Sequence, residues 1–177
     1  MGCKRLIPIY GGDKMGIFIY AFSATGKSTV AKKYSNVIDM ESTLYKYLGV
    51  FKEDESLKST EREINQQWPE NYFNKLMEVK DKYDYILISD DICNEFLKEN
   101  NFEYWIVYPK KELKEEYMDR CKKRGNNDVF ISWYSKLWDE WIDKCKSDKL
   151  ALRHIELQSN QYLEEVLPNL KKDKNIC

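Results

Sequence analysis

Residues 17–29 have the sequence Ile-Phe-Ile-Tyr-Ala-Phe-Ser-Ala-Thr-Gly-Lys-Ser-Thr, an apolar run followed by small and hydroxyl-bearing residues and a lysine. The apolar part, bounded by Gly16, is typical of a strand buried on both faces of a sheet. The second part matches the phosphate-binding pattern G-x-x-x-x-G-K-[ST] at every fixed position except the first, where Ala21 replaces glycine. This stretch therefore predicts a strand, a phosphate-binding loop and the start of a helix.

Buried strands and amphipathic helices alternate along the rest of the chain. The further strands are expected at Val37–Met40, Tyr85–Ser89, Tyr104–Tyr108 and His154–Leu157. Helices are expected at Lys27–Tyr34, from Pro69 to about Lys82, at Glu112–Arg124, and from a cap at Asp128 onward. This alternation predicts an α/β fold of three layers, a five-stranded parallel sheet with helices on both faces. Ligands of such sheets bind beyond the carboxyl ends of the strands.

Composition narrows the class of protein. A chain of 177 residues fits one domain, so we predict a single domain over residues 1–177. The net charge of −1 excludes a global positive field that would attract nucleic acid or an anionic membrane. No apolar stretch is long enough to span a bilayer, and no signal peptide is evident. The five cysteines form no CxxC pair. We therefore expect reduced thiols, a cytoplasmic location and no membrane partner.

The charged segment Lys52–Arg62 is interpreted as a surface loop or a poorly ordered helix.

The phosphate loop assigns a first set of binding residues. Backbone N–H groups of such a loop and of the following helix converge on phosphate oxygens. In this mechanism Lys27 bridges the β and γ oxygens of ATP, and Ser28 ligates Mg²⁺. The alternative is a helix that begins with an exposed lysine, but the strand before and the helix after favour the loop. The nucleotide-binding residues are predicted to be Ser23, Ala24, Thr25, Gly26, Lys27, Ser28 and Thr29.

Two strands end in acidic residues. Asp39 and Glu41 follow the strand at Val37, and alternation along an extended chain directs both toward the site. The alternative is that Asp39 or Ser42 caps the next helix. Asp90 and Asp91 follow the strand at Tyr85, the pattern of a Walker B motif. Asp90 is the favoured acid on the Mg²⁺ side, with Asp91 as the alternative or as the cap of a helix that starts at Ile92.

A basic segment supplies two arginines. Arg120 and Arg124 lie four residues apart, on one face of a helix that Gly125 ends. Guanidinium groups suit phosphate, and such a group can stabilise the charge of a transferring phosphoryl. The alternative is a solvated helix end whose cations complement the dipole.

The loop, the strand positions and the arginine segment resemble those of the P-loop kinases of the nucleoside monophosphate kinase and shikimate kinase-like group, which includes compact members with alanine at the first loop position. This resemblance implies that Asp39 and Glu41 correspond to an Asp-x-Asp pair that holds Mg²⁺ and contacts the acceptor hydroxyl. It implies a short lid-like segment near residues 110–128, because Arg120 to Gly125 matches the R-x-x-x-R-G stretch at the lid of guanylate-kinase-like enzymes. It also implies that Ser159, Asn160 and Gln161 contact adenine.

Together these observations predict a P-loop kinase that uses ATP and Mg²⁺ to phosphorylate a small, nucleotide-like acceptor. A nucleoside monophosphate is favoured because the arginines provide charge for a second phosphate. The alternatives are a hydroxyl acceptor (a nucleoside, a polynucleotide 5′ end or a small metabolite) with Asp39 or Glu41 as general base, and a non-catalytic nucleotide-binding or NTPase switch module. Nucleic acid is expected only as an end substrate, and the oligomeric state is left open.

Overall fold

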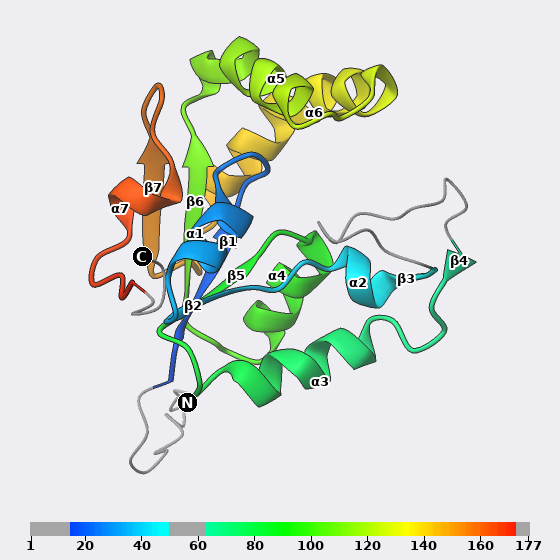
Figure 1. Ribbon diagram of the computed structural model, residues 1–177, viewed down its shortest axis with the longest axis vertical. Coiled ribbons are helices and arrows are strands. Elements are labelled where there is room, and N and C mark those ends of the chain that lie inside the picture. The colour runs from blue at the N-terminus through cyan, green and yellow to red at the C-terminus, as the bar shows by residue number, and fades with distance from the viewer. Residues whose placement is uncertain (1–14, 50–62, 173–177) are drawn as a thin grey trace, which may run out of the picture.

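A computed structural model describes residues 15–49 and 63–172, so the charged segment Lys52–Arg62 lies outside the described residues. Five parallel strands form one sheet, as the sequence predicts, and their order is β2-β5-β1-β6-β7 (Figure 1). The strands are β1 (Ile17–Ala21), β2 (Val37–Asp39), β5 (Tyr85–Ile88), β6 (Tyr104–Pro109) and β7 (Arg153–Leu157).

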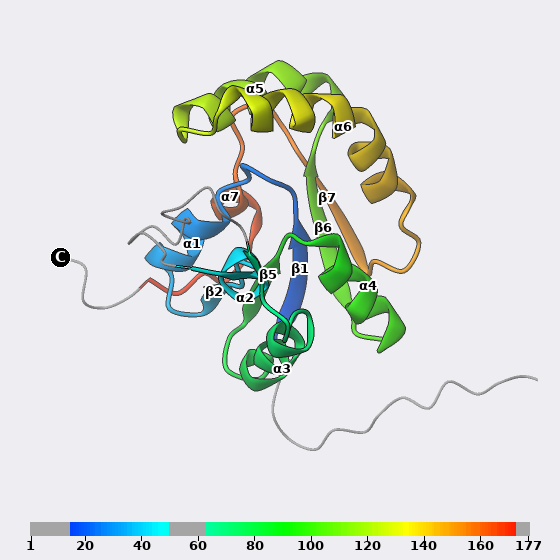
Figure 2. The same ribbon diagram turned by 90° about the vertical axis from the view of Figure 1, so that its right-hand side faces the viewer.

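Helices cover both faces of the sheet, which confirms the three-layer architecture. Alternate strand residues face opposite sides, so Phe18 and Ile19 belong to two separate cores. Figure 2 shows α1 and α7 on one side of the sheet and α4 and α6 on the other. The helices are α1 (Lys27–Lys33), α3 (Glu70–Val79), α4 (Asp91–Glu99), α5 (Lys114–Lys123), α6 (Asp128–Ser147) and α7 (Leu163–Val166).

The long helix α6 has the predicted apolar face, with a different cap. Tyr134, Trp138 and Ile142 recur at four-residue spacing and are buried. The cap is Asn127 and not Asp128, since the Asn127 side chain accepts a hydrogen bond from the Phe130 N–H at 2.8 Å. Asparagine and aspartate cap equally well, so their order in the sequence did not distinguish them.

The helix expected at Glu112–Arg124 consists of a 3₁₀ turn, η1 (Lys111–Leu113), followed by α5. Gly125 ends α5 with φ +83°, as predicted. The Gly125 N–H bonds to the Lys122 carbonyl at 2.9 Å and the Asn126 N–H to the Cys121 carbonyl at 3.1 Å. These two bonds form a Schellman motif, which satisfies the last carbonyls of the helix and turns the chain toward α6.

One region has no counterpart in the sequence predictions. A short helix α2 (Thr43–Lys46) leads into a two-stranded antiparallel ladder of β3 (Tyr47–Leu48) and β4 (Glu63–Ile64). These elements lie beside α3, away from α1 and α7 (Figure 1). Strands of two residues are too short to show a period-two pattern.

Among the described residues, none of the helices has both the length and the apolar character needed to cross a membrane. Cys93, Cys121 and Cys145 are buried free thiols.

Candidate functional site

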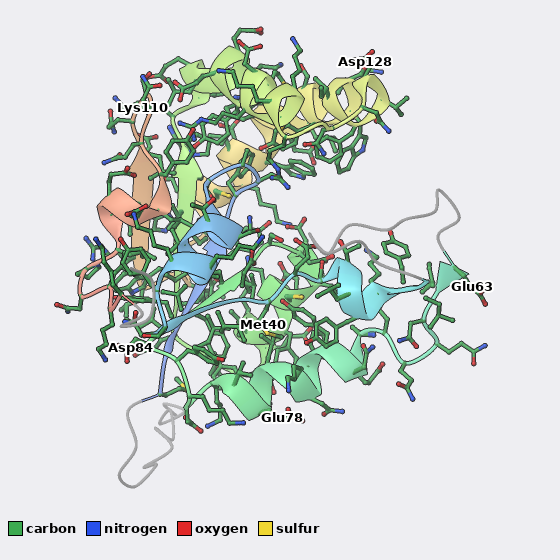
Figure 3. The ribbon with its side chains drawn as sticks, viewed as in Figure 1. Met40, Glu63, Glu78, Asp84, Lys110 and Asp128 are labelled. Carbon is green, nitrogen blue, oxygen red and sulfur yellow. The ribbon has the colours of Figure 1, made fainter. Side chains whose placement is uncertain are left out.

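The predicted site residues gather where the strands end. The loop after β1, the end of β2 and the turn after β5 belong to neighbouring strands, because β5 pairs with both β1 and β2. In Figure 1, α5 and α6 lie across this carboxyl edge. Lys110 and Asp128, labelled in Figure 3, mark the two ends of the segment that holds α5. The arrangement is the one expected for an open parallel sheet.

The loop turns sharply at its glycine. Gly26 has φ +91° and is the N-cap residue of α1. A Cβ at this position would lie 3.2 Å from the ring of Tyr162. The Gly26 carbonyl accepts the first helical hydrogen bond, from Val30 N–H at 3.0 Å. Both the positive φ and the approach of the ring therefore require glycine here.

The alanine that departs from the loop pattern has a structural reason. Ala21 is the last residue of β1 and pairs with Val107. The residues with positive φ in the described chain do not include it, so no glycine is needed. Ala24 does have positive φ, at 58°, a conformation that a non-glycine residue keeps only when its surroundings impose it. The neighbouring Thr25 is buried and its hydroxyl donates to the Phe22 carbonyl at 2.7 Å.

Lys27 lies inside the loop. Its ammonium donates to the carbonyls of Ala21 and Phe22, both at 3.0 Å, and the residue is only 9% exposed. Burial lowers its pKa, and the charge of Arg124 acts in the same direction. The carboxylates of Asp39 and Glu41 oppose that shift, so both lie near the ammonium. The buried cation faces a loop that can accept phosphate oxygens.

Ser28 and Asp39 meet directly. The Ser28 hydroxyl donates to Asp39 Oδ2 at 2.8 Å, which places the end of β2 against the start of α1. Glu41 accepts from the N–H and the hydroxyl of Thr43, at 3.2 and 2.7 Å. Ser42 is the N-cap residue of α2 but makes no side-chain cap. Capping of α2 by Asp39 or Ser42 is therefore wrong.

Asp90 and Asp91 have separate partners. Asp90 Oδ1 caps α4 by accepting from Ile92 N–H at 3.1 Å, so the alternative that Asp91 caps this helix is wrong. Asp90 Oδ2 accepts from Ser42 Oγ at 3.3 Å and lies 3.6 Å from Lys46 Nζ. No contact of Asp90 with Ser28 is recorded among the described residues; the carboxylate on Ser28 is that of Asp39.

Asp91 is directed to another part of the molecule. It accepts hydrogen bonds from the Tyr20 hydroxyl and from Lys144 Nζ, the latter at 2.8 Å. Burial works to raise its pKa, but the bonds from Lys144 and Tyr20 outweigh burial and the pKa is lowered. Burial beside this carboxylate raises the pKa of Tyr20. Asp91 thus links β1, α4 and α6, and Asp90 is the one that faces α2.

Arg120 holds the phosphate loop to two other elements. The residue is 8% exposed. Its guanidinium donates to the carbonyls of Ala24 and Gln161, all at 3.3 Å, and pairs with Glu116 at 2.5 Å. It also lies 3.9 Å from the Tyr162 ring centroid, within the range of cation–π attraction. All these contacts are to protein groups, so in this conformation Arg120 ties α5 to the loop.

The segment expected to contact adenine shares the same partners. Ser159 Oγ and Asn160 N–H both donate to Glu116, at 2.8 and 2.9 Å. These bonds and the one from Arg120 lower the pKa of Glu116, although its burial works to raise it. Leu163 N–H donates to the Thr25 carbonyl at 3.0 Å. The residues after β7 therefore lie against the loop, where the resemblance places adenine; the contact itself stays a prediction.

Arg124 is the exposed arginine of the pair. It is the C-cap residue of α5 and is solvent-exposed, and its charge contributes to the lowered pKa of Lys27. Gly125 follows it, with open space where a Cβ would be. The position suits a cation that reaches toward the loop, and the lid function of residues 110–128 stays a prediction.

Oxygen atoms that could bind magnesium lie at the start of α1 and the end of β2. Within residues 15–49 and 63–172, no group of three or more His, Cys, Asp or Glu is placed to hold a metal. Mg²⁺ in phosphotransferases needs no such group, because it keeps several waters and shares phosphate oxygens with the nucleotide. Ser28 and Asp39 provide adjacent hard oxygen atoms, the chemistry that this ion prefers.

Comparison of the sequence with known protein families and with curated proteins finds no match. The assignment of a function therefore rests on the site itself.

Sequence reasoning did not identify Lys46 or Tyr162. Lys46 lies on a helix that the sequence did not predict, and its acidic partner is 44 residues away along the chain. Tyr162 is the residue that packs on both Gly26 and Arg120. A tyrosine after a predicted strand gives no sequence signal of such contacts.

Proposed function

We propose that this protein is a phosphotransferase that binds ATP with Mg²⁺ and transfers the γ-phosphoryl group to a small acceptor, with a nucleoside monophosphate favoured. The observation that carries the proposal is the loop itself. Lys27 is buried against two loop carbonyls, its turn requires glycine, and Ser28 touches a carboxylate from the next strand end. A solvent-exposed lysine at a helix start would not be buried against these carbonyls.

The residues supply the electrostatics that phosphoryl transfer needs. Phosphate oxygens replace the carbonyls of Ala21 and Phe22 as partners of Lys27, which is already desolvated and therefore interacts strongly. Arg124 adds a second positive charge, which already contributes to the lowered pKa of Lys27. Ser28 with Asp39 would hold Mg²⁺, which would supply positive charge at the nucleotide phosphates.

A hydroxyl acceptor is the second candidate, because Asp39 and Glu41 both lie near Lys27. A carboxylate at this position can accept the proton of an attacking hydroxyl. A monophosphate needs no such base, since it is already ionised.

The test is an acceptor screen with ATP and Mg²⁺ over nucleosides, nucleoside monophosphates and 5′-hydroxyl oligonucleotides. ADP formation that requires a monophosphate, stops in EDTA and returns with Mg²⁺ or Mn²⁺ is the expected result. ADP formed at the same rate without any acceptor would identify an NTPase and refute the proposal. No turnover, with or without an acceptor, would instead favour a nucleotide-binding module.

A further inference from the structure

The helix α2 ends in a lysine that lies at the carboxyl edge of the sheet. Lys46 Nζ is 3.6 Å from Asp90 Oδ2, and the two side chains are 32% and 20% exposed. Asp90 follows β5, the strand that pairs with β1, so this ammonium lies at the strand next to the one that carries the phosphate loop. This cation is therefore outside the loop and partly accessible to solvent.

Two aromatic rings frame the same ammonium. Lys46 Nζ lies 5.5 Å from the centroid of the Trp68 ring and 5.9 Å from that of Tyr47. Both distances are within the range of cation–π attraction. The Trp68 ring packs edge-on against Tyr72 at 5.5 Å. The Tyr72 hydroxyl donates to the Met40 carbonyl at 2.7 Å, and Met40 lies between β2 and α3 (Figure 3). Trp68 is therefore fixed to the core, and it forms with Tyr47 an aromatic wall beside the ammonium.

The ion pair of Lys46 leaves bonding capacity for a stronger anion. A charge-assisted hydrogen bond to a carboxylate is about 2.7–2.9 Å long, whereas the pair with Asp90 is 3.6 Å. An ammonium has three donors. By contrast, Lys27 bonds two carbonyls at 3.0 Å and is buried. Of these two lysines, Lys46 is the one that an incoming phosphate can recruit without disturbing the loop.

We propose that Lys46, with the rings of Tyr47 and Trp68, forms the acceptor site, and that the acceptor is an anion carrying a planar ring, a nucleoside monophosphate. The acceptor phosphate takes Lys46 from Asp90, and the base packs on the aromatic wall, where stacking does not depend on base identity. In the absence of acceptor, Asp90 holds the place of that phosphate. The assignment of the bound monophosphate as the phosphoryl acceptor rests on the proposed phosphotransferase function.

Direct binding tests the site without ATP or metal. The four common nucleoside 5′-monophosphates and their nucleosides are titrated by calorimetry into the wild type, Lys46→Met, Lys46→Arg and Lys75→Met. Lys75 is the matched control, an exposed helical lysine that pairs with Glu78. Lys46→Met should weaken monophosphate binding about 10- to 100-fold and leave the nucleosides unchanged. Lys46→Arg should keep most of the affinity, and Lys75→Met all of it.

Asp90→Asn gives the opposite expectation. Asparagine also caps helices well, so α4 keeps its N-cap, while the charge that competes for Lys46 is removed. Monophosphates should bind several-fold more tightly than to the wild type. Equal monophosphate binding by wild type and Lys46→Met would overturn the proposal, as would weaker binding by Asp90→Asn.

The two proposals fail in different ways. Binding that depends on Lys46, with no transfer from ATP to any monophosphate, would keep this anion site and refute the phosphotransferase. Transfer to a monophosphate with kcat and KM unchanged in Lys46→Met would keep the enzyme and refute the site.

Discussion

The candidate phosphate loop and helix α2 lie at one edge of the same sheet but differ in how firmly they are held. The loop is held by buried bonds, both within it, such as Thr25 to the Phe22 carbonyl at 2.7 Å, and from the distant residues Arg120 and Leu163. Helix α2 is half-buried, and its last residue, Lys46, reaches the sheet edge through the 3.6 Å ion pair with Asp90. Under the proposed function, the donor side is thus built before any ligand arrives, whereas the acceptor side contains an ion pair that a ligand can exchange.

The largest effect is expected inside the loop. Lys27→Ala should lower kcat for transfer by about 10³-fold or more, because a preorganised cation at the transferring group is removed. Lys32→Ala, an exposed lysine on the same helix, serves as control and should retain activity. Steady-state ADP formation with a coupled assay measures both. Wild-type turnover in Lys27→Ala would show that the loop is not the donor site.

The next effect decides what the acceptor side must supply. For a monophosphate acceptor, Arg124→Ala should raise the acceptor KM and lower kcat, since a charge-assisted hydrogen bond contributes about 1.5–3 kcal/mol. Glu41→Gln should then have a smaller effect on transfer, whereas Asp39→Asn should raise the Mg²⁺ concentration that transfer needs, because Asp39 belongs to the proposed Mg²⁺ site. A loss in kcat of about 10² or more in Glu41→Gln, with acceptor KM unchanged in Arg124→Ala, would instead identify a hydroxyl kinase.

The same contrast explains what the sequence could predict. The strand, the loop and the start of the helix lie in one continuous stretch, residues 17–29. The apolar run, the glycine and the lysine of that stretch therefore predict them together. Asp39 was placed correctly at a strand end because the strand before it is apolar. The sequence did not decide which of two neighbouring residues caps a helix, because the choice depends on side-chain rotamers. This holds for Asn127 and Asp128 at α6 and for Asp90 and Asp91 at α4. The position of the Lys46 side chain could not be predicted either, because its partner Asp90 lies 44 residues away along the chain.

Arg120 is buried, whereas Arg124 is exposed. The loss of Arg120 should therefore lower the stability of the fold. Arg120→Ala leaves Glu116 without its cation and removes bonds to the Ala24 and Gln161 carbonyls. The expected cost is roughly 2 kcal/mol, which is less than the roughly 3–5 kcal/mol for a fully buried pair because Glu116 keeps some contact with water. Urea unfolding of this variant, with Lys122→Ala as an exposed control, measures it. Transfer that is lost at unchanged stability would instead give Arg120 a direct role at the phosphoryl group.

The smallest effect is a pH dependence that belongs to the loop alone. Burial lowers the pKa of Lys27 from its ordinary value of 10.5, so the folded state holds its proton less tightly than the unfolded state does. Below the folded pKa both states are protonated and the full cost of the buried charge is present. Between the folded pKa and 10.5 the unfolded state binds more protons, so the free energy of unfolding rises with pH.

Lys27→Met removes that titration and keeps a side chain of similar length. The stability of the wild type relative to Lys27→Met should therefore increase as the pH rises from neutral toward 10.5, because the wild type loses its buried charge in that window. Urea unfolding of both variants along this pH range measures the difference. The subtraction cancels groups common to both proteins, including Tyr20, whose pKa is raised. A difference that stays constant with pH would show that the pKa of Lys27 is the same in the folded and the unfolded protein, which would contradict the prediction.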